Sequence, residues 1–178
     1  MIDAPYISAD RPGIGSDADT LPQFTLQPEM GTDGREIRAG ITDRLEVNRD
    51  ENDWAVKYRL IGTEKAKASV KLTYHSVELP MNFILSDHVN IGIDTLLSRD
   101  GNVYVGELNL TPNPRLTIMP TFYYDTKPRM SIFASYIPKG HNNIQLDIGF
   151  DRGKAIIGIA TAIDFSGIDF SSIDFRRH

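Results

Sequence analysis

The sequence has no cysteine, no apolar run of helix length and no basic cluster. The lack of cysteine in 178 residues excludes a disulfide framework and thiolate metal sites. No apolar stretch reaches the roughly 20 residues that a membrane-spanning helix needs. The net charge is −5, and the lack of a basic stripe argues against nucleic acid as a partner. The 4 histidines show no metal-ligand spacing, so the sequence predicts neither a metal site nor a cofactor.

Residues 77–97 contain the pattern that most of the chain repeats. Apolar and polar residues alternate over residues 77–85 and again over residues 89–93, with Ser86-Asp87-His88 between the two runs. A period of two places alternate side chains on opposite faces of an extended strand. The stretch therefore predicts two amphipathic strands joined by a tight turn.

Alternation of this kind continues from residue 23 to residue 165 and predicts an all-β fold without helices. We count about twelve strands of roughly seven to twelve residues, with connections mostly of about two to six residues. Such short connections force antiparallel, up-and-down strand order. We divide the chain into an N-terminal arm (1–22), a β-barrel (23–165) and a C-terminal tail (166–178), with Ile-Asp-Phe recurring three times near the end.

Two architectures fit this meander, because a long open sheet would leave two bare edges. In a transmembrane β-barrel the apolar face points to lipid and the polar face lines the lumen. In a soluble β-sandwich the apolar face forms the core, which would bury residues such as Trp54, Leu72 and Ile148. The barrel interpretation assigns ten charged residues to the lumen: Glu36, Arg38, Glu46, Lys57, Arg59, Lys71, Glu78, Asp94, Glu107 and Asp147.

Aromatic residues favour the membrane barrel, since such barrels carry aromatic girdles at both lipid interfaces. If the strands run alternately up and down, one end of the barrel receives Trp54, Tyr74, Tyr104, Tyr124 and Phe150. The opposite end receives Phe24, Tyr136 and Phe165. These eight aromatic residues are predicted to lie at the lipid interfaces.

The N-terminal arm and several turns resemble a known family. Residues 7–13 (ISADRPG), followed by residues 19–23 (DTLPQ), are similar to the mature N-terminus of bacterial outer-membrane transporters of the phenol-degradation MetA-pathway type. The turn at residues 41–46 and the strand at residues 55–60 are also similar to that family. The resemblance implies an outer-membrane location. The chain departs from it by being shorter and by ending in FRRH instead of a terminal aromatic residue.

The expected function is passive passage or binding of a small solute through a charged lumen, with the lipid bilayer as partner and no enzymatic activity. The alternative is a soluble β-rich binding or assembly module, for example of a viral or surface particle. Ser86-Asp87-His88 has the residue types of a catalytic triad, but adjacent turn residues lack the required geometry. The GSDAD motif at residues 15–19 lacks the remaining ligands of a calcium loop. The first five residues, MIDAP, lack the features of a secretory signal. The solute and the oligomeric state stay open.

Overall fold

The computed structural model describes residues 16–166 apart from residues 33 and 52. All regular structure in this part of the chain is β-strand. The strands of the first half are β1 (Thr25–Gly31), β2 (Gly34–Thr42), β3 (Leu45–Asp50), β4 (Trp54–Gly62), β5 (Ala66–Thr73), β6 (Ser76–Glu78) and β7 (Met81–Ser86). Those of the second half are β8 (Val89–Ser98), β9 (Gly101–Asn113), β10 (Leu116–Tyr124), β11 (Pro128–Tyr136), β12 (Ile144–Asp151), β13 (Lys154–Thr161) and β14 (Ile163–Asp164).

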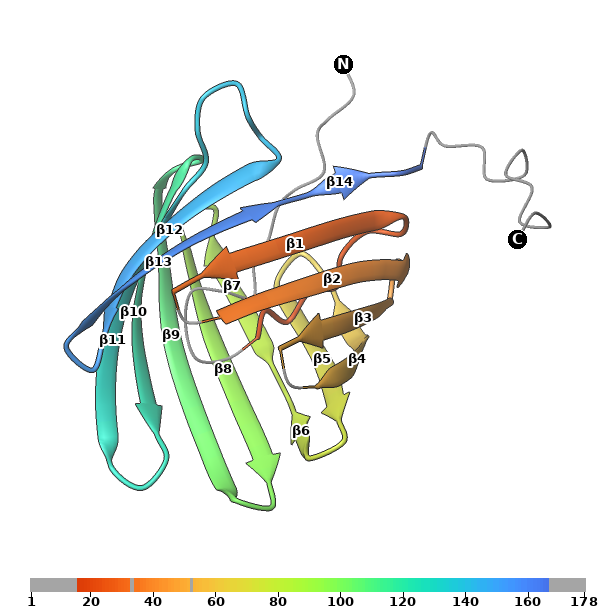
Figure 1. Ribbon diagram of the computed structural model, residues 1–178. Coiled ribbons are helices and arrows are strands. Elements are labelled where there is room, and N and C mark those ends of the chain that lie inside the picture. The colour runs from red at the N-terminus through yellow and green to blue at the C-terminus, as the bar shows by residue number, and fades with distance from the viewer. Residues whose placement is uncertain (1–15, 33, 52, 167–178) are drawn as a thin grey trace.

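The sheet closes on itself into an antiparallel barrel. Strands that follow one another in sequence pair with each other, apart from β6 with β7 and β13 with β14. Strand β1 returns to pair with β13 through Glu29↔Ala160 and with β14 through Thr25↔Asp164. Figure 1 shows one continuous curved wall in which β1 lies beside β13 and β14. Closure leaves no bare edge, which confirms the predicted up-and-down barrel.

The fourteen segments correspond to twelve wall positions, because two positions are each occupied by a pair of segments. Both β6 and β7 pair with β5 on one side and β8 on the other. The break between them falls at Leu79 and Pro80, where proline lacks the N–H that a ladder requires. In the same way, β13 and β14 both lie along β1.

The turns follow from local chemistry. Ser86, Asp87 and His88 connect β7 to β8 as predicted, and the Ser86 hydroxyl accepts a hydrogen bond from the His88 backbone N–H at 3.3 Å. Between β12 and β13, Arg152 (φ 51°) and Gly153 (φ 76°) form a two-residue turn with positive φ at both positions. This is the backbone that suits the twist of a hairpin.

The distribution of side chains is the reverse of that in a soluble protein. The exposed outer face carries large apolar residues, including Trp54 (62% exposed) and Ile148 (57% exposed). Most of the buried residues in the interior are charged or polar. The hydrophobic core cluster consists of Ala160 and Ala162, with the partly buried Ile137 packed against them. The soluble-sandwich alternative is therefore wrong, since the residues that it would place in a core lie on the outside.

Candidate functional site

The candidate site is the inner wall of the barrel. Alternation on closed strands sends every second side chain inward. All ten residues assigned to a lumen are buried or half-buried; six of them are buried, namely Glu36, Arg38, Glu46, Lys57, Asp94 and Asp147, and four are intermediate, namely Arg59, Lys71, Glu78 and Glu107.

Arg38 on β2 is the centre of a fully buried ion-pair network. Its Nε and Nη2 atoms donate to Glu46 Oε1 and Oε2, both at 2.9 Å, and its Nη1 lies 3.3 Å from Glu29 Oε1. Lys57 Nζ on β4 lies 3.8 Å from the same Glu46 Oε1. Because β1, β2, β3 and β4 are successive neighbours, these pairs run along the wall between adjacent strands. Pairing of this kind offsets the large cost of burying each charge alone.

A segment of the arm, residues 16–22, lies inside the barrel against this wall. Leu21 is 2% exposed, and its backbone N–H donates to Glu46 Oε2 at 2.7 Å. The Ser16 backbone N–H donates to Asp94 Oδ2 at 3.0 Å. The Asn82 side-chain amide donates to Asp17 Oδ1 at 2.8 Å. The segment therefore contacts β3, β7 and β8 at once, and it shares Glu46 with the Arg38 network.

Asp19 attaches this segment to the wall through two ion pairs. Arg59 Nη1 on β4 lies 2.7 Å from Asp19 Oδ1, and Lys67 Nζ on β5 lies 2.5 Å from Asp19 Oδ2. Burial by itself would raise the pKa of Asp19, but the hydrogen bonds and charges of Lys67 and Arg59 outweigh it and hold the pKa below its ordinary value. Asp19 is therefore a carboxylate anion at neutral pH.

The chain turns sharply where the segment leaves the interior and joins β1. Phe24 has a φ of 62°, which is rare for a bulky residue, and its backbone N–H donates to the Gly40 carbonyl at 3.0 Å. A Cβ on Gly40 would lie 2.0 Å from the Pro22 carbonyl oxygen. A side chain at position 40 would thus exclude the segment from its present path.

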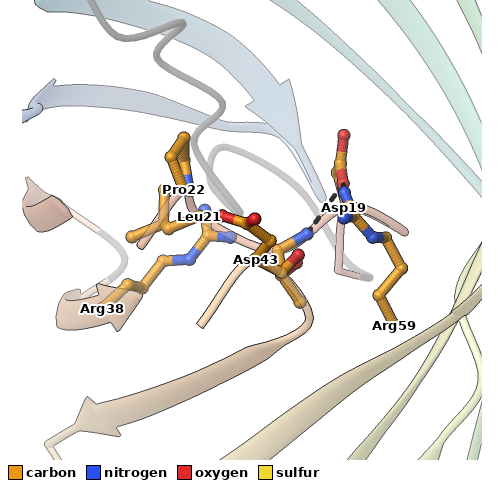
Figure 2. A pocket seen from close by; sticks show the side chains of 7 residues that line it. Asp19, Leu21, Pro22, Arg38, Asp43 and Arg59 are labelled. Carbon is orange, nitrogen blue, oxygen red and sulfur yellow. Dashed lines mark hydrogen bonds and ion pairs between the residues drawn. The ribbon is translucent and has the colours of Figure 1, made fainter. Parts of the chain in front are cut away.

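Between the segment and the wall lies a cavity of about 270 Å³ (Figure 2). It is lined by Asp19, Thr20, Leu21, Pro22, Arg38, Asp43 and Arg59. In Figure 2, Asp19 and Arg59, which form an ion pair, lie together on one side of this space and Arg38 lies on the other. Its lining combines apolar groups with two cations, Arg38 and Arg59, and two acids, Asp19 and Asp43, so it offers hydrogen-bonding partners of both signs to a small solute.

The wall formed by β9–β13 carries a different set of buried groups. Glu107 accepts hydrogen bonds from Asn109 Nδ2 at 2.7 Å and Thr121 Oγ1 at 3.4 Å. Asp147 accepts from Ser135 Oγ at 2.6 Å and from Gln145 Nε2 at 2.9 Å. The described bonds of these carboxylates thus come from hydroxyl and amide groups.

On the same side of the interior, Tyr123 donates to Asp151, and Arg129 lies over the Tyr123 ring at 5.9 Å from its centroid. The Phe133 ring covers Gly149 on the neighbouring strand, where an added Cβ would lie 2.0 Å from a ring carbon.

The eight predicted interface aromatics lie near strand ends on the outer face. Seven of them are exposed and Phe165 is half-buried. Tyr104 and Tyr124 are direct cross-strand partners, and the Phe165 backbone N–H donates to the Phe24 carbonyl at 2.9 Å. The strand order thus places aromatic residues at both ends of the barrel, while their contact with lipid stays a prediction.

Two motifs considered for other chemistry have structural roles. The His88 ring Nδ1 lies 2.9 Å from the Thr111 carbonyl oxygen, on the turn between β7 and β8. Asp17 and Asp19 of the GSDAD motif are bound by Asn82, Arg59 and Lys67. Within the described residues, no group of three or more potential metal-ligating side chains occurs. No helix in that part of the chain is long and apolar enough to cross a membrane.

Sequence reasoning did not find that part of the arm lies inside the barrel. It treated residues 1–22 as one arm, of which residues 1–15 lie outside the described part, as do most of the predicted tail and residues 7–13 of the family resemblance. Lys67 was not among the predicted lumen residues, although it lies on β5 and binds Asp19. Gly40 is the one indication in the sequence. It occupies an inward-facing position of β2 with a residue that has no side chain, which leaves room for the segment.

Comparisons with known proteins identify the fold but not a family. No protein-family model and no curated protein sequence matches the chain. Among solved structures, the KdgM porin in complex with disordered oligogalacturonate matches with a TM-score of 0.51 and 14% identity, covering 77% of this chain and 96% of that one. The chain shares the porin-like β-barrel fold.

Two further porins resemble this chain more loosely. The NanC porin has a TM-score of 0.43 and 12% identity, covering 77% of this chain and 98% of that one. A mutant of the Rhodopseudomonas blastica porin has a TM-score of 0.46 and 10% identity, covering 73% of this chain and 55% of that one.

Proposed function

We propose that this protein is a bacterial outer-membrane β-barrel that lets a small solute pass passively through its interior. The observation that carries the proposal is the reversed distribution of side chains. Large apolar residues cover the outside of a closed barrel, and the interior buries charged residues. A lipid bilayer is the environment in which such an outer face is stable, and a polar interior is typical of channel-forming barrels.

The proposed path runs along the ten inward-facing charged residues, whose positions decide which solutes are favoured. The ion pairs of Arg38 run between adjacent strands, which supports passage, because charges that paired across the barrel would obstruct it. Lys71 on β5 and Glu36 on β2 do pair past two intervening strands, at 3.5 Å, so we expect the path to run clear of that pair. The eight outer aromatic residues are proposed to lie at the two lipid interfaces. The resemblance to MetA-pathway transporters supports the same location and is proposed as the family.

The closed barrel argues against the alternative function as a soluble assembly module. It requires residues such as Trp54 and Leu72 to be shielded within a core, yet both are exposed on the outer face. A soluble protein rarely exposes contiguous apolar surface on such a scale.

Purification with and without detergent tests the proposal. We expect aggregation in plain buffer and a folded, heat-modifiable band on gels after refolding into detergent micelles. Folded protein should then produce discrete conductance steps in a planar bilayer, and heat-unfolded protein provides the control. A monodisperse, β-rich protein in plain buffer would refute the membrane barrel, and a folded barrel without conductance would refute passage.

A further inference from the structure

Asp19 is bound by two cations in the interior of the barrel, and what we infer from this site rests on the channel proposed above. Arg59 and Lys67 come from the adjacent strands β4 and β5, and each binds a different oxygen of the same carboxylate, at 2.7 and 2.5 Å. Two cations that converge on one carboxylate form a recognition site for that group. The three side chains are about one quarter to one third exposed, so water reaches the site.

The occupant of this site is attached as a ligand would be. The described bonds from residues 16–21 to the wall run mostly to side chains, such as Asp94, Asn82 and Glu46, and do not form a strand ladder. The exception is the Thr20 hydroxyl, which donates to the Asp43 carbonyl at 3.0 Å. The segment can therefore leave the wall without breaking any strand pairing of the barrel.

Space for a competing molecule lies directly beside the ion pairs. The cavity of about 270 Å³ is lined by both Asp19 and Arg59. Its volume is several times the roughly 30 Å³ that one water molecule occupies in the liquid. A small organic acid in this cavity would have its carboxylate within reach of Arg59 once Asp19 moved aside.

We propose that Arg59 and Lys67 form a carboxylate-binding site in the barrel interior, and that Asp19 is an internal ligand which an acidic solute displaces. Residues 16–22 then block part of the interior until a carboxylate solute takes the place of Asp19. The solute class that the site recognises is a small organic acid.

Binding of succinate to the full-length barrel in detergent micelles, measured by calorimetry, tests the site directly. Replacing Asp19 by Asn removes the internal competitor and should tighten succinate binding about tenfold, the effect of roughly one charge-assisted hydrogen bond. Asp87→Asn removes the same charge from an exposed turn and should leave the affinity unchanged. The double variant D19N/R59Q should lose the gain. Succinamide, which has the same shape without charge, should not compete.

Hydrogen exchange in the wild-type protein gives a second measurement that needs no variant. Succinate, and not succinamide, should increase exchange of the amides in residues 16–22 while β9–β13 stay protected. Equal succinate affinity in D19N and the wild type, the same gain in D19N/R59Q, or no change in exchange during a succinate titration would each overturn the proposal.

These outcomes are separate from the fate of the channel. Succinate binding by a barrel that conducts nothing would retain the site and refute passage. Conductance without the expected binding differences would retain the channel and refute the site.

Discussion

The wall formed by β1–β5 and the wall formed by β9–β13 stabilise their buried carboxylates by different means. On the first wall, Glu46 is bound by Arg38 and Lys57, and it also accepts the backbone N–H of Leu21. On the second, Glu107 is bound by the side chains of Asn109 and Thr121. The first wall is thus a charge network completed by a segment of the chain itself. On the second wall the described bonds of Glu107 come from neutral groups, and the ion pair of the buried Asp151 with Arg152 lies at its end, at the turn after β12.

The difference predicts that the two walls differ in rigidity. Removing one partner of a buried ion pair is costly, so the ion pairs hold the side chains of the first wall in place and anchor residues 16–22. Hydroxyl and amide groups exchange partners with water at lower cost. The wall formed by β9–β13 is therefore the side along which we expect a solute to move past the segment.

The largest expected effect comes from breaking the charge network. Glu46→Gln leaves the buried charges of Arg38 and Lys57 short of a partner and should lower the free energy of unfolding by about 3–5 kcal/mol. Glu107→Gln on the opposite wall should cost about 1 kcal/mol or less, because neutral hydrogen bonds persist. Urea unfolding in lipid vesicles, followed by fluorescence of Trp54, measures both. Equal losses would show that the two walls do not differ.

Substitution of one glycine on each wall compares the two walls, because an added Cβ would approach its nearest atom equally closely at both positions. A Cβ at Gly40 would meet the Pro22 carbonyl oxygen at 2.0 Å, and a Cβ at Gly149 would meet the Phe133 ring at the same distance. Backbone cannot give way as a side chain can, so Gly40→Ala should cost about 1–3 kcal/mol of unfolding free energy and displace residues 16–22.

Gly149→Ala, the matched variant, should cost less, since only the Phe133 side chain must shift. Bilayer conductance should rise in Gly40→Ala and stay near the wild-type level in Gly149→Ala. Higher conductance in both variants would mean that displacement of the segment is not the cause.

A smaller effect is expected from pH through Asp19. Its pKa is held below the ordinary 3.8, so the stabilisation that it gives is complete above pH 3.8 and is lost as the pH falls through the lowered value. Protonation of Asp19 should therefore raise the conductance as the pH falls below about 4. Asp19→Asn should remove this rise. High salt at neutral pH should loosen the segment too, because the ion pairs are partly exposed.

The smallest effects are expected at two serines, one on each wall. Within the described residues, neither Ser69 Oγ on β5 nor Ser131 Oγ on β11 has a hydrogen-bond partner, and both are buried. Replacing either by Ala removes a hydroxyl that makes no bond, so the free energy of unfolding should change by less than about 0.5 kcal/mol. A large loss at one serine would show that its wall depends on groups beyond the contacts described above.

Several parts of the fold were predictable because they depend on neighbouring residues alone. The hairpin of β7 and β8 was predicted with its turn at Ser86-Asp87-His88, and the structure confirms both. The break at Pro80 was not predicted, because alternation continues across it in the sequence. The inward direction of Lys67 was also missed, since β5 begins at Ala66, directly after the polar residues Thr63, Glu64 and Lys65, where no alternation is visible.

The sequence by itself determined the strands, their antiparallel order and the charged face, because a period of two and short connections act locally. Only the tertiary structure decided that this face points inward and that Asp19 pairs with Arg59 and Lys67, 40 and 48 residues away. Alternation is the same whether a sheet closes one way or the other. Contacts between a non-strand segment and distant strands leave no periodic trace, since they depend on closure of the barrel around the segment.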